Sequence, residues 1–118
     1  TTALEKTWPD DLETPVLFLG EWCRLYSRKE RWSKMNAEVL PYHWDDRNKL
    51  YNDYQYLNII YENTLKALQK QLNEIHQVDH SLRYWRILIG PWLGYFIQMV
   101  FDRWTMLKHA FEKHDAEE

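Results

Sequence analysis

Residues 80–98 have the sequence HSLRYWRILIGPWLGYFIQ, and this stretch decides the fold. Its apolar side chains recur every three or four residues, which predicts a helix capped by Asp79 or Ser81. Gly90 and Pro91 fall inside that helix. Proline lacks a backbone donor and clashes with the turn before it, at a cost of about 3 kcal/mol. We therefore predict a helix over about residues 81–113 that is broken near Gly90-Pro91.

A second helix is predicted immediately before this one, over about residues 46–76. Its apolar positions follow one another in steps of three and four: Leu50, Tyr54, Leu57, Tyr61, Leu65, Leu68, Leu72 and Ile75. Asp45 or Asp46 can cap its first turn. Because the connection between the two helices is short, they are expected to pack as antiparallel neighbours. The predicted fold class is therefore mainly α, based on a long antiparallel helical hairpin.

The N-terminal third of the chain has a different pattern. A short apolar run near residues 16–20, between Pro15 and Gly20, is typical of a buried β-strand. A second short strand is predicted near residues 38–41, ending at Pro41. We expect one or two short strands beside the hairpin, within a single domain of 118 residues.

Composition excludes several classes of protein. The net charge is −3, with acidic and basic residues interspersed, so no nucleic-acid partner is expected. The single cysteine, Cys23, excludes an internal disulfide and a cysteine-based zinc site. We expect no metal and no cofactor. The longest apolar run, residues 87–101, is shorter than the ~20 residues that span a bilayer, so no transmembrane segment is expected. The predicted location is cytoplasmic, with peripheral association with the inner membrane left open.

The same run, residues 87–101, is apolar almost all round and should be covered on more than one side. The other helix of the hairpin offers only one apolar stripe. We therefore expect the helix of residues 81–113 to be covered by a second copy or by the rest of a longer parent chain.

The interrupted helix carries the first group of candidate binding residues. Arg83 and Arg86 are one turn apart, and Gly90 with Pro91 would free the amides of Trp92 and the residue after it. Guanidinium groups and a helix N-terminus both suit a phosphate or an acidic sugar. The alternative is structural: the arginines pair with acidic residues of a neighbouring helix, and Gly90 and Gly94 only permit close packing.

Two further candidates lie after the predicted strands. Gly20 would let a substrate approach the backbone, and Glu21 could act as a base; the alternative is a tight turn with Trp22 in the core. His43 stands beside two carboxylates and has the chemistry of a general base. The alternative there is that Asp45 and Asp46 only cap the following helix.

Four strings occur in order along the chain. They are VLFLGEWC at residues 16–23, EVLPYHWDDR at 38–47, LNEIH at 72–76 and HSLRYWRILIGPWL at 80–93. Together they resemble the N-terminal region of a family of transferases associated with bacterial O-antigen and surface-polysaccharide gene clusters. The opening, TTALEKTW at residues 1–8, is also similar to the start of that family.

The resemblance implies that residues 1–118 are the N-terminal fragment of a larger, glycosyltransferase-like protein, because members of that family are several times longer. It implies a nucleotide-activated sugar as substrate and carries over no catalytic residue. Our leading hypothesis is sugar transfer, with Arg83 and Arg86 binding phosphate or an acidic sugar and Glu21 or His43 assisting deprotonation of an acceptor hydroxyl. The alternative is a helical interaction or oligomerisation module without catalytic activity.

Overall fold

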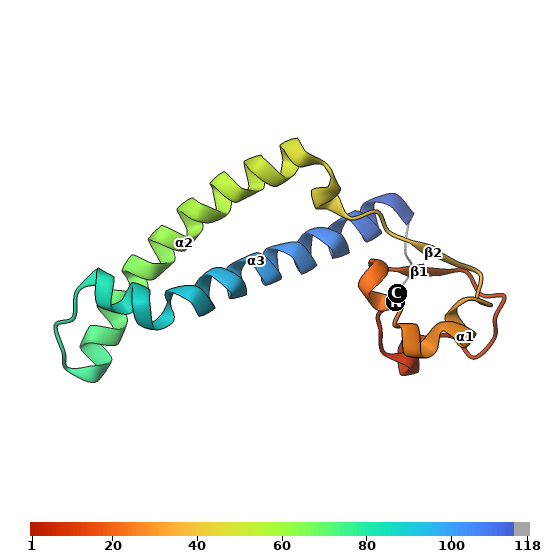
Figure 1. Ribbon diagram of the computed structural model, residues 1–118, viewed down its shortest axis with the longest axis horizontal. Coiled ribbons are helices and arrows are strands. Elements are labelled where there is room, and N and C mark those ends of the chain that lie inside the picture. The colour runs from red at the N-terminus through yellow and green to blue at the C-terminus, as the bar shows by residue number, and fades with distance from the viewer. Residues whose placement is uncertain (115–118) are drawn as a thin grey trace. The chain divides into compact units, whose positions relative to one another are not determined.

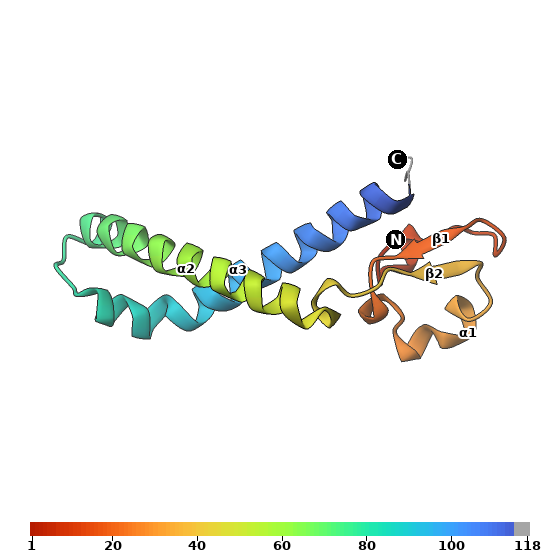
Figure 2. The ribbon, with the colours of Figure 1, turned by 90° about the horizontal axis from the view of Figure 1, so that it is seen from above.

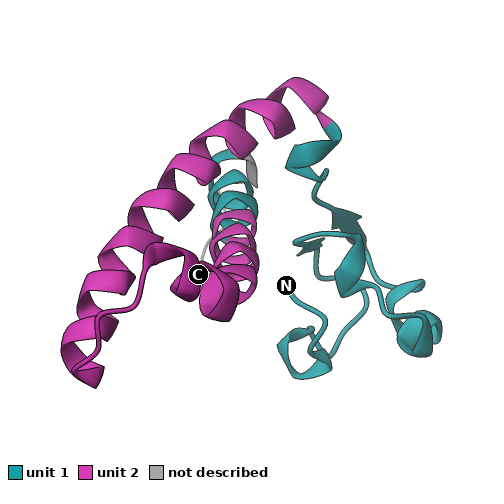
Figure 3. Ribbon diagram, turned by 60° about the vertical axis from the view of Figure 1, so that its left-hand side comes forward, with its two compact units in different colours: residues 1–45, 104–118 teal, residues 46–103 magenta. Residues whose placement is uncertain are grey.

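The computed structural model describes residues 1–114. The chain divides into two compact units, distinguished by colour in Figure 3. One unit contains residues 46–103, and the other contains residues 1–45 together with the chain from residue 104 onward. We describe each unit by itself.

The hairpin unit, residues 46–103, is unit 2 in Figure 3 and contains the predicted pair of long helices (Figures 1 and 2). Helix α2 spans Arg47–His76, and helix α3 spans Leu82–His114 and continues into the other unit. Asp46 caps α2 by accepting hydrogen bonds from the amides of Asn48 and Lys49. Ser81 begins α3, where its hydroxyl accepts from the amide of Tyr84 at 3.3 Å. The expected helical hairpin is therefore confirmed. Of the alternative caps, Asp46 is the one that caps α2 and Ser81 the one that caps α3.

The core of the hairpin uses most of the predicted apolar stripe of α2 and one face of α3, whereas Tyr54 and Ile75 of that stripe are exposed. Leu65, Trp85 and Leu93 are buried together. Around them pack partly buried apolar residues of both helices: Tyr61, Leu68, Leu72, Leu82, Ile89 and Ile97. Near the turn, the Trp85 indole donates to the Asn73 side chain at 2.8 Å. The Asn73 side chain also bonds the backbone of His80, so this end of the hairpin is held by polar as well as apolar contacts.

The predicted break at Gly90-Pro91 is wrong. Helix α3 is one helix from Leu82 to His114, with Pro91 inside it. Proline deprives the carbonyl four residues earlier, that of Ile87, of its usual donor. Ile87 and Pro91 both lie on the exposed face of the helix, where solvent can satisfy that carbonyl. One backbone hydrogen bond is therefore absent at Pro91, and the helix continues past it.

The strand unit, which is unit 1 in Figure 3, is built on two short parallel strands, β1 (Val16–Phe18) and β2 (Ala37–Val39). Val16 is opposite Ala37, and Phe18 is opposite Val39. Both predicted strands exist, although β1 is shorter than expected and β2 begins one residue earlier. The connection between them contains 3-10 turns at Glu21–Cys23 and Tyr26–Arg28 and the short helix α1, Lys29–Trp32. A parallel pair requires such a crossover.

Side chains on alternating faces of β1 enter two small cores. On one face Val16 and Phe18 pack with Trp8, Cys23 and Met35. On the other face lies a cluster of Leu40, Met106 and Ala110, with Leu17, Leu19 and Tyr42 against it. Met106 and Ala110 belong to the last turns of α3, so the end of that helix covers the strand pair. The period of two in a strand explains why neighbouring residues enter different cores.

The outward face of α3 is not covered by α2, and the expected cover by a second copy or by the rest of a longer parent chain stays a prediction. Within the hairpin unit its exposed apolar side chains are Tyr84, Ile87, Leu88, Trp92, Tyr95, Phe96, Met99 and Val100. Only the side of the helix toward α2 is buried, because α2 offers a single stripe. No helix within residues 1–114 has an apolar stretch sufficient to cross a membrane.

Candidate functional site

The best-defined candidate site lies at the carboxyl ends of β1 and β2. Since the two strands are parallel and in register, the loops that follow them leave the same edge of the pair. The first loop carries Gly20 and Glu21, and the second carries His43. The rings of Trp22 and Tyr42, one from each loop, lie 5.9 Å apart in an edge-to-face arrangement. Two candidate segments separated by about twenty residues of sequence therefore meet at one edge.

Gly20 is required at this edge by its neighbour Trp22. A Cβ atom at position 20 would lie 2.3 Å from the Trp22 ring, much closer than any real contact. The Gly20 backbone itself is extended, with φ of 161°. The Trp22 ring thus occupies the space beside Gly20, whereas the approach of a substrate to this backbone stays a prediction. Trp22 nevertheless remains partly exposed at the edge.

Glu21 projects into solvent beside this ring. Its carboxylate pairs with the Arg24 guanidinium at 3.2 Å, and its side chain is 76 % exposed. Arg24 lies over the Trp32 ring, 4.4 Å from the ring centre, which orients the guanidinium. Glu21 is therefore accessible to a ligand, and an oriented cation stands one helical turn away.

His43 is buried among aromatic rings from two segments, its own loop and α3. Its imidazole lies 4.6 Å from Trp44, 5.2 Å from Tyr42 and 6.1 Å from His109, measured between ring centres. His109 comes from the last turns of α3, which the sequence analysis did not connect with His43. Nothing in the local sequence pattern could have made that connection, because it depends on how α3 packs against the strands.

In the hairpin unit, Arg86 is engaged by α2. Its guanidinium donates two hydrogen bonds to the Glu62 carboxylate, at 2.6 and 2.8 Å. It also lies 5.8 Å from the Tyr61 ring centre. The hydrogen bond from Arg86 is the main cause that lowers the pKa of Glu62 below its usual value. The same bond raises the pKa of Arg86. Arg86 is thus paired with an acidic residue of the neighbouring helix, which was the structural alternative to binding a phosphate.

Gly90 likewise serves the packing of the two helices. A Cβ atom at position 90 would lie 2.6 Å from the Tyr61 hydroxyl, whereas one at Gly94 would lie 3.7 Å from the same ring. Tyr61 of α2 thus lies against a groove in α3 that the two glycines provide. The role of Gly90 in binding a substrate stays a prediction.

Arg83 and Trp92 remain available on the surface of the hairpin unit. Arg83 is exposed and forms no ion pair within residues 1–114. Trp92 is 60 % exposed and stacks on Phe96, with ring centres 5.2 Å apart. Because α3 is continuous, the amides after Pro91 are part of a helix and do not form a new helix N-terminus. Of the two predicted arginines, Arg83 is the one whose donors are uncommitted.

The candidate residues therefore fall into two sets in different units. Gly20, Glu21 and His43 belong to the strand unit, and Arg83, Arg86, Gly90 and Trp92 belong to the hairpin unit. In the part of the chain that the structure describes, no group of three or more His, Cys, Asp or Glu side chains is arranged to hold a metal ion.

Comparison with known proteins identifies one family. The family model described as LIC12162 family transferase matches residues 1–118. No curated protein and no solved structure matches the chain.

Proposed function

The chain belongs to the LIC12162 family of transferases, and from this premise we propose that it is the N-terminal part of an enzyme that transfers a sugar from a nucleotide-activated donor. The acceptor would be a growing bacterial surface polysaccharide, as in O-antigen biosynthesis. The resemblance of the strings at residues 16–23, 38–47, 72–76 and 80–93 supports this pathway. We further propose a cytoplasmic location, where nucleotide-activated sugars are made.

The observation that carries the proposal is the meeting of two loops at the carboxyl edge of β1 and β2. Ligands of open parallel sheets bind beyond the carboxyl ends of the strands. An acceptor hydroxyl needs a base to remove its proton as the new bond forms. Glu21 is exposed at this edge and His43 is buried beneath it. We propose that Glu21 or His43 accepts that proton, and that Gly20 and Trp22 form the wall against which the acceptor lies.

The diphosphate of the donor needs cations to balance its charge. Arg83 has uncommitted donors, whereas the Arg86 donors are already used by Glu62. As a separate proposal for the hairpin unit by itself, we propose Arg83 as a phosphate contact. Trp92 follows nine residues later, on the opposite side of the helix, so its exposed ring would be a second contact that is independent of Arg83. Arg86 would act through the Glu62 pair, by keeping this stretch of α3 in place.

The experiment measures release of nucleoside diphosphate by the full-length protein. We expect Glu21→Gln or His43→Gln to lower kcat by at least about 100-fold, the smaller end of what positioned acid–base groups contribute. Arg83→Ala should raise KM for the donor. The matched controls are Glu38→Gln, an exposed carboxylate on β2, and Arg47→Ala, an exposed arginine of the hairpin unit. Folding of each variant is checked by circular dichroism, since His43 is buried.

Transfer that is unchanged in Glu21→Gln, and in a folded His43→Gln, would contradict the proposed base. A donor KM that is the same in Arg83→Ala and in the wild type would contradict the proposed phosphate contact.

A second candidate function is a helical interaction module, favoured by the uncovered apolar face of α3. Tyr95, Ile87 and Trp92 on this face are each at least 60 % exposed, which is typical of a surface that binds another protein. If the face mediates self-association, light scattering after gel filtration should show a dimer that Tyr95→Glu dissociates and Lys66→Glu, on the exposed face of α2, leaves intact. A monomer at every concentration would exclude a second copy as the partner.

A further inference from the structure

A groove in the strand unit, not among the predicted sites, is lined by cations. It follows the crossover between the strands, has a volume of about 870 Å³, and opens to solvent. Its charged lining residues comprise four cations and two carboxylates: Arg28, Lys29, Arg31, Lys34, Glu5 and Glu30. In a chain with a net charge of −3, this is a local excess of positive charge. Because the groove is wide open, a ligand bound there would keep one side in solvent.

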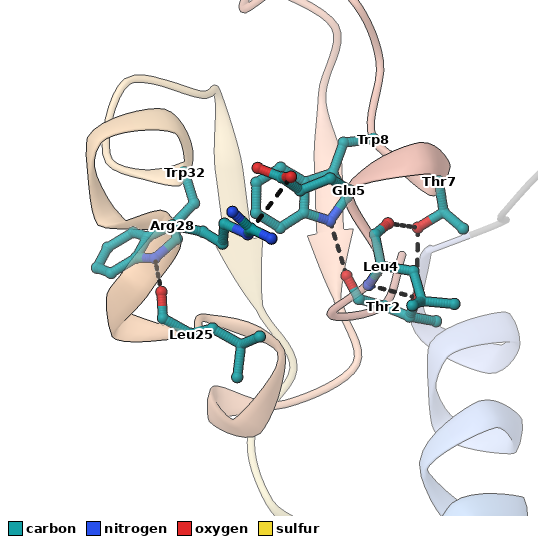
Figure 4. Close-up of polar contacts among 8 residues, drawn as sticks. All are labelled: Thr2, Leu4, Glu5, Thr7, Trp8, Leu25, Arg28 and Trp32. Atoms are coloured by element: carbon teal, nitrogen blue, oxygen red, sulfur yellow. Dashed lines mark hydrogen bonds and ion pairs between the residues drawn. The ribbon is translucent and has the colours of Figure 1, made fainter.

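Two of the four cations are held in place by groups around the groove. The Arg28 guanidinium pairs with the Glu5 carboxylate at 3.4 Å, a contact drawn in Figure 4. The Arg31 guanidinium donates to the Pro9 carbonyl at 3.3 Å and lies 5.5 Å from the centre of the Trp8 ring. Each of these contacts uses only part of a guanidinium, which has five N–H donors. The remaining donors are positioned before a ligand arrives, which lowers the entropic cost of binding.

Two indole rings in this unit are fixed by hydrogen bonds, and one of them, Trp8, is the ring that Arg31 lies over. Figure 4 shows the Trp8 indole donating to the Thr2 carbonyl, at 2.7 Å, and the Trp32 indole donating to the Leu25 carbonyl, at 2.8 Å. Trp8 is also buried in the core against Phe18. The Trp8 ring that lies under Arg31 is therefore held in place.

The other two cations have no acidic partner. Lys29 and Lys34 are exposed and form no ion pair within residues 1–114. The Lys29 ammonium lies 5.9 Å from the centre of the Tyr26 ring, and Tyr26 is 86 % exposed. A large aromatic ring that is exposed beside free cations offers a stacking surface next to a charge-binding surface.

We propose that this groove binds an organic diphosphate, with Arg28, Arg31, Lys29 and Lys34 around the diphosphate and Tyr26 against the organic part. Guanidinium forks match the paired oxygens of a phosphate, and lysines add charge without fixed direction. Four cations and two carboxylates give the lining a net charge of +2, which is more than one carboxylate would neutralise. The same chemistry is present in a nucleoside diphosphate and in an isoprenoid diphosphate, and the experiment separates these two sources.

This inference does not rest on the proposed sugar transfer, because binding is measured without acceptor or turnover. Isothermal titration calorimetry of the protein uses inorganic pyrophosphate, uridine diphosphate and farnesyl diphosphate as probes. The test variant is Lys29→Ala/Lys34→Ala, which removes two exposed charges. The matched control is Lys66→Ala/Lys70→Ala, which removes two exposed charges from α2.

We expect the test variant to bind pyrophosphate at least about tenfold more weakly, since two charge-assisted contacts are lost. The control variant should bind within about twofold of the wild type, and added salt should weaken binding. If uridine diphosphate binds more tightly than pyrophosphate, the organic part of the ligand is a nucleoside. If farnesyl diphosphate binds more tightly than pyrophosphate, the organic part is an isoprenoid. In either case Tyr26→Ala should abolish the gain over pyrophosphate.

Three results would overturn the proposal. The first is no pyrophosphate binding at millimolar concentration. The second is an equal loss of affinity in the test and control variants, which would show only a general effect of net charge. The third is an organic diphosphate that binds no more tightly than pyrophosphate, which would refute the role of Tyr26. Arg28→Lys, which keeps the charge but removes the fork, provides a variant whose fold is not at risk from a lost cation.

Discussion

Replacing Gly90 with alanine tests whether the glycines of α3 serve packing, and Gly94 provides an internal control. Both residues are inside the same helix, where alanine is favoured over glycine by about 1 kcal/mol. The two positions differ in the space available. A Cβ atom would lie 2.6 Å from the Tyr61 hydroxyl at position 90, but 3.7 Å from the Tyr61 ring at position 94.

These distances set the expected magnitudes. At position 94 the contact is an ordinary van der Waals distance, so Gly94→Ala should stabilise the hairpin by up to about 1 kcal/mol. At position 90 Tyr61 must move away from its place beside Arg86, and such crowding costs about 1–3 kcal/mol. Gly90→Ala should therefore be less stable than Gly94→Ala by about that crowding cost.

The assay is urea unfolding followed by circular dichroism at a helical wavelength, which reports mainly on α2 and α3 because they contain most of the helical residues. Tyr61→Phe removes the hydroxyl that meets the new Cβ atom. In that background Gly90→Ala should cost less than in the wild type, giving a measurable coupling between the two positions. If Gly90→Ala proved as stable as Gly94→Ala, or if Tyr61→Phe gave no relief, the packing argument would be refuted.

Two further predictions concern the same hairpin. Arg86 lowers the pKa of Glu62 below 4.5 in the folded protein, so between the two pKa values the unfolded state binds more protons than the folded state. The Glu62–Arg86 pair therefore contributes its full stabilisation above about pH 4.5, and this contribution is lost as the pH falls through the pKa of Glu62 in the folded protein. Urea unfolding between about pH 6 and about pH 3 should show this loss. If the free energy of unfolding of Glu62→Gln fell with pH as steeply as that of the wild type, the prediction would be contradicted. Leu65→Ala, at a fully buried site, should cost about 2–5 kcal/mol. Ile59→Ala, at an exposed site of the same helix, should change stability by less than about 0.5 kcal/mol, and equal losses at the two sites would refute the assigned core.

The candidate site was only partly accessible from sequence. Glu21 and His43 were recognised separately, from residue type and from their place after apolar runs. That they face one edge depends on the parallel pairing of β1 and β2, and pairing between distant segments leaves no local signal. His109 was missed for the same reason, since its proximity to His43 arises from the packing of α3. The cationic groove was missed because its lining comes from several turns whose fold has no regular period.

The interpretation of Pro91 shows the limit of a local rule. Proline in a helix has a known cost, and that cost predicted a break. The rule does not say whether the freed carbonyl faces solvent or core. In this helix it belongs to Ile87 on the exposed face, so the cost is small enough for α3 to continue.

The sequence by itself determined the two long helices, their caps and their antiparallel packing. Apolar spacing and capping residues act over a few neighbours in the chain, so they can be recognised without a structure. Only the tertiary structure decided the partners: Glu62 for Arg86, Tyr61 for Gly90, and the strand edge where the loops that carry Trp22 and Tyr42 meet. Those choices depend on the register between elements distant in the chain. Register is fixed by the packing of whole faces, because many weak contacts must be satisfied at the same time.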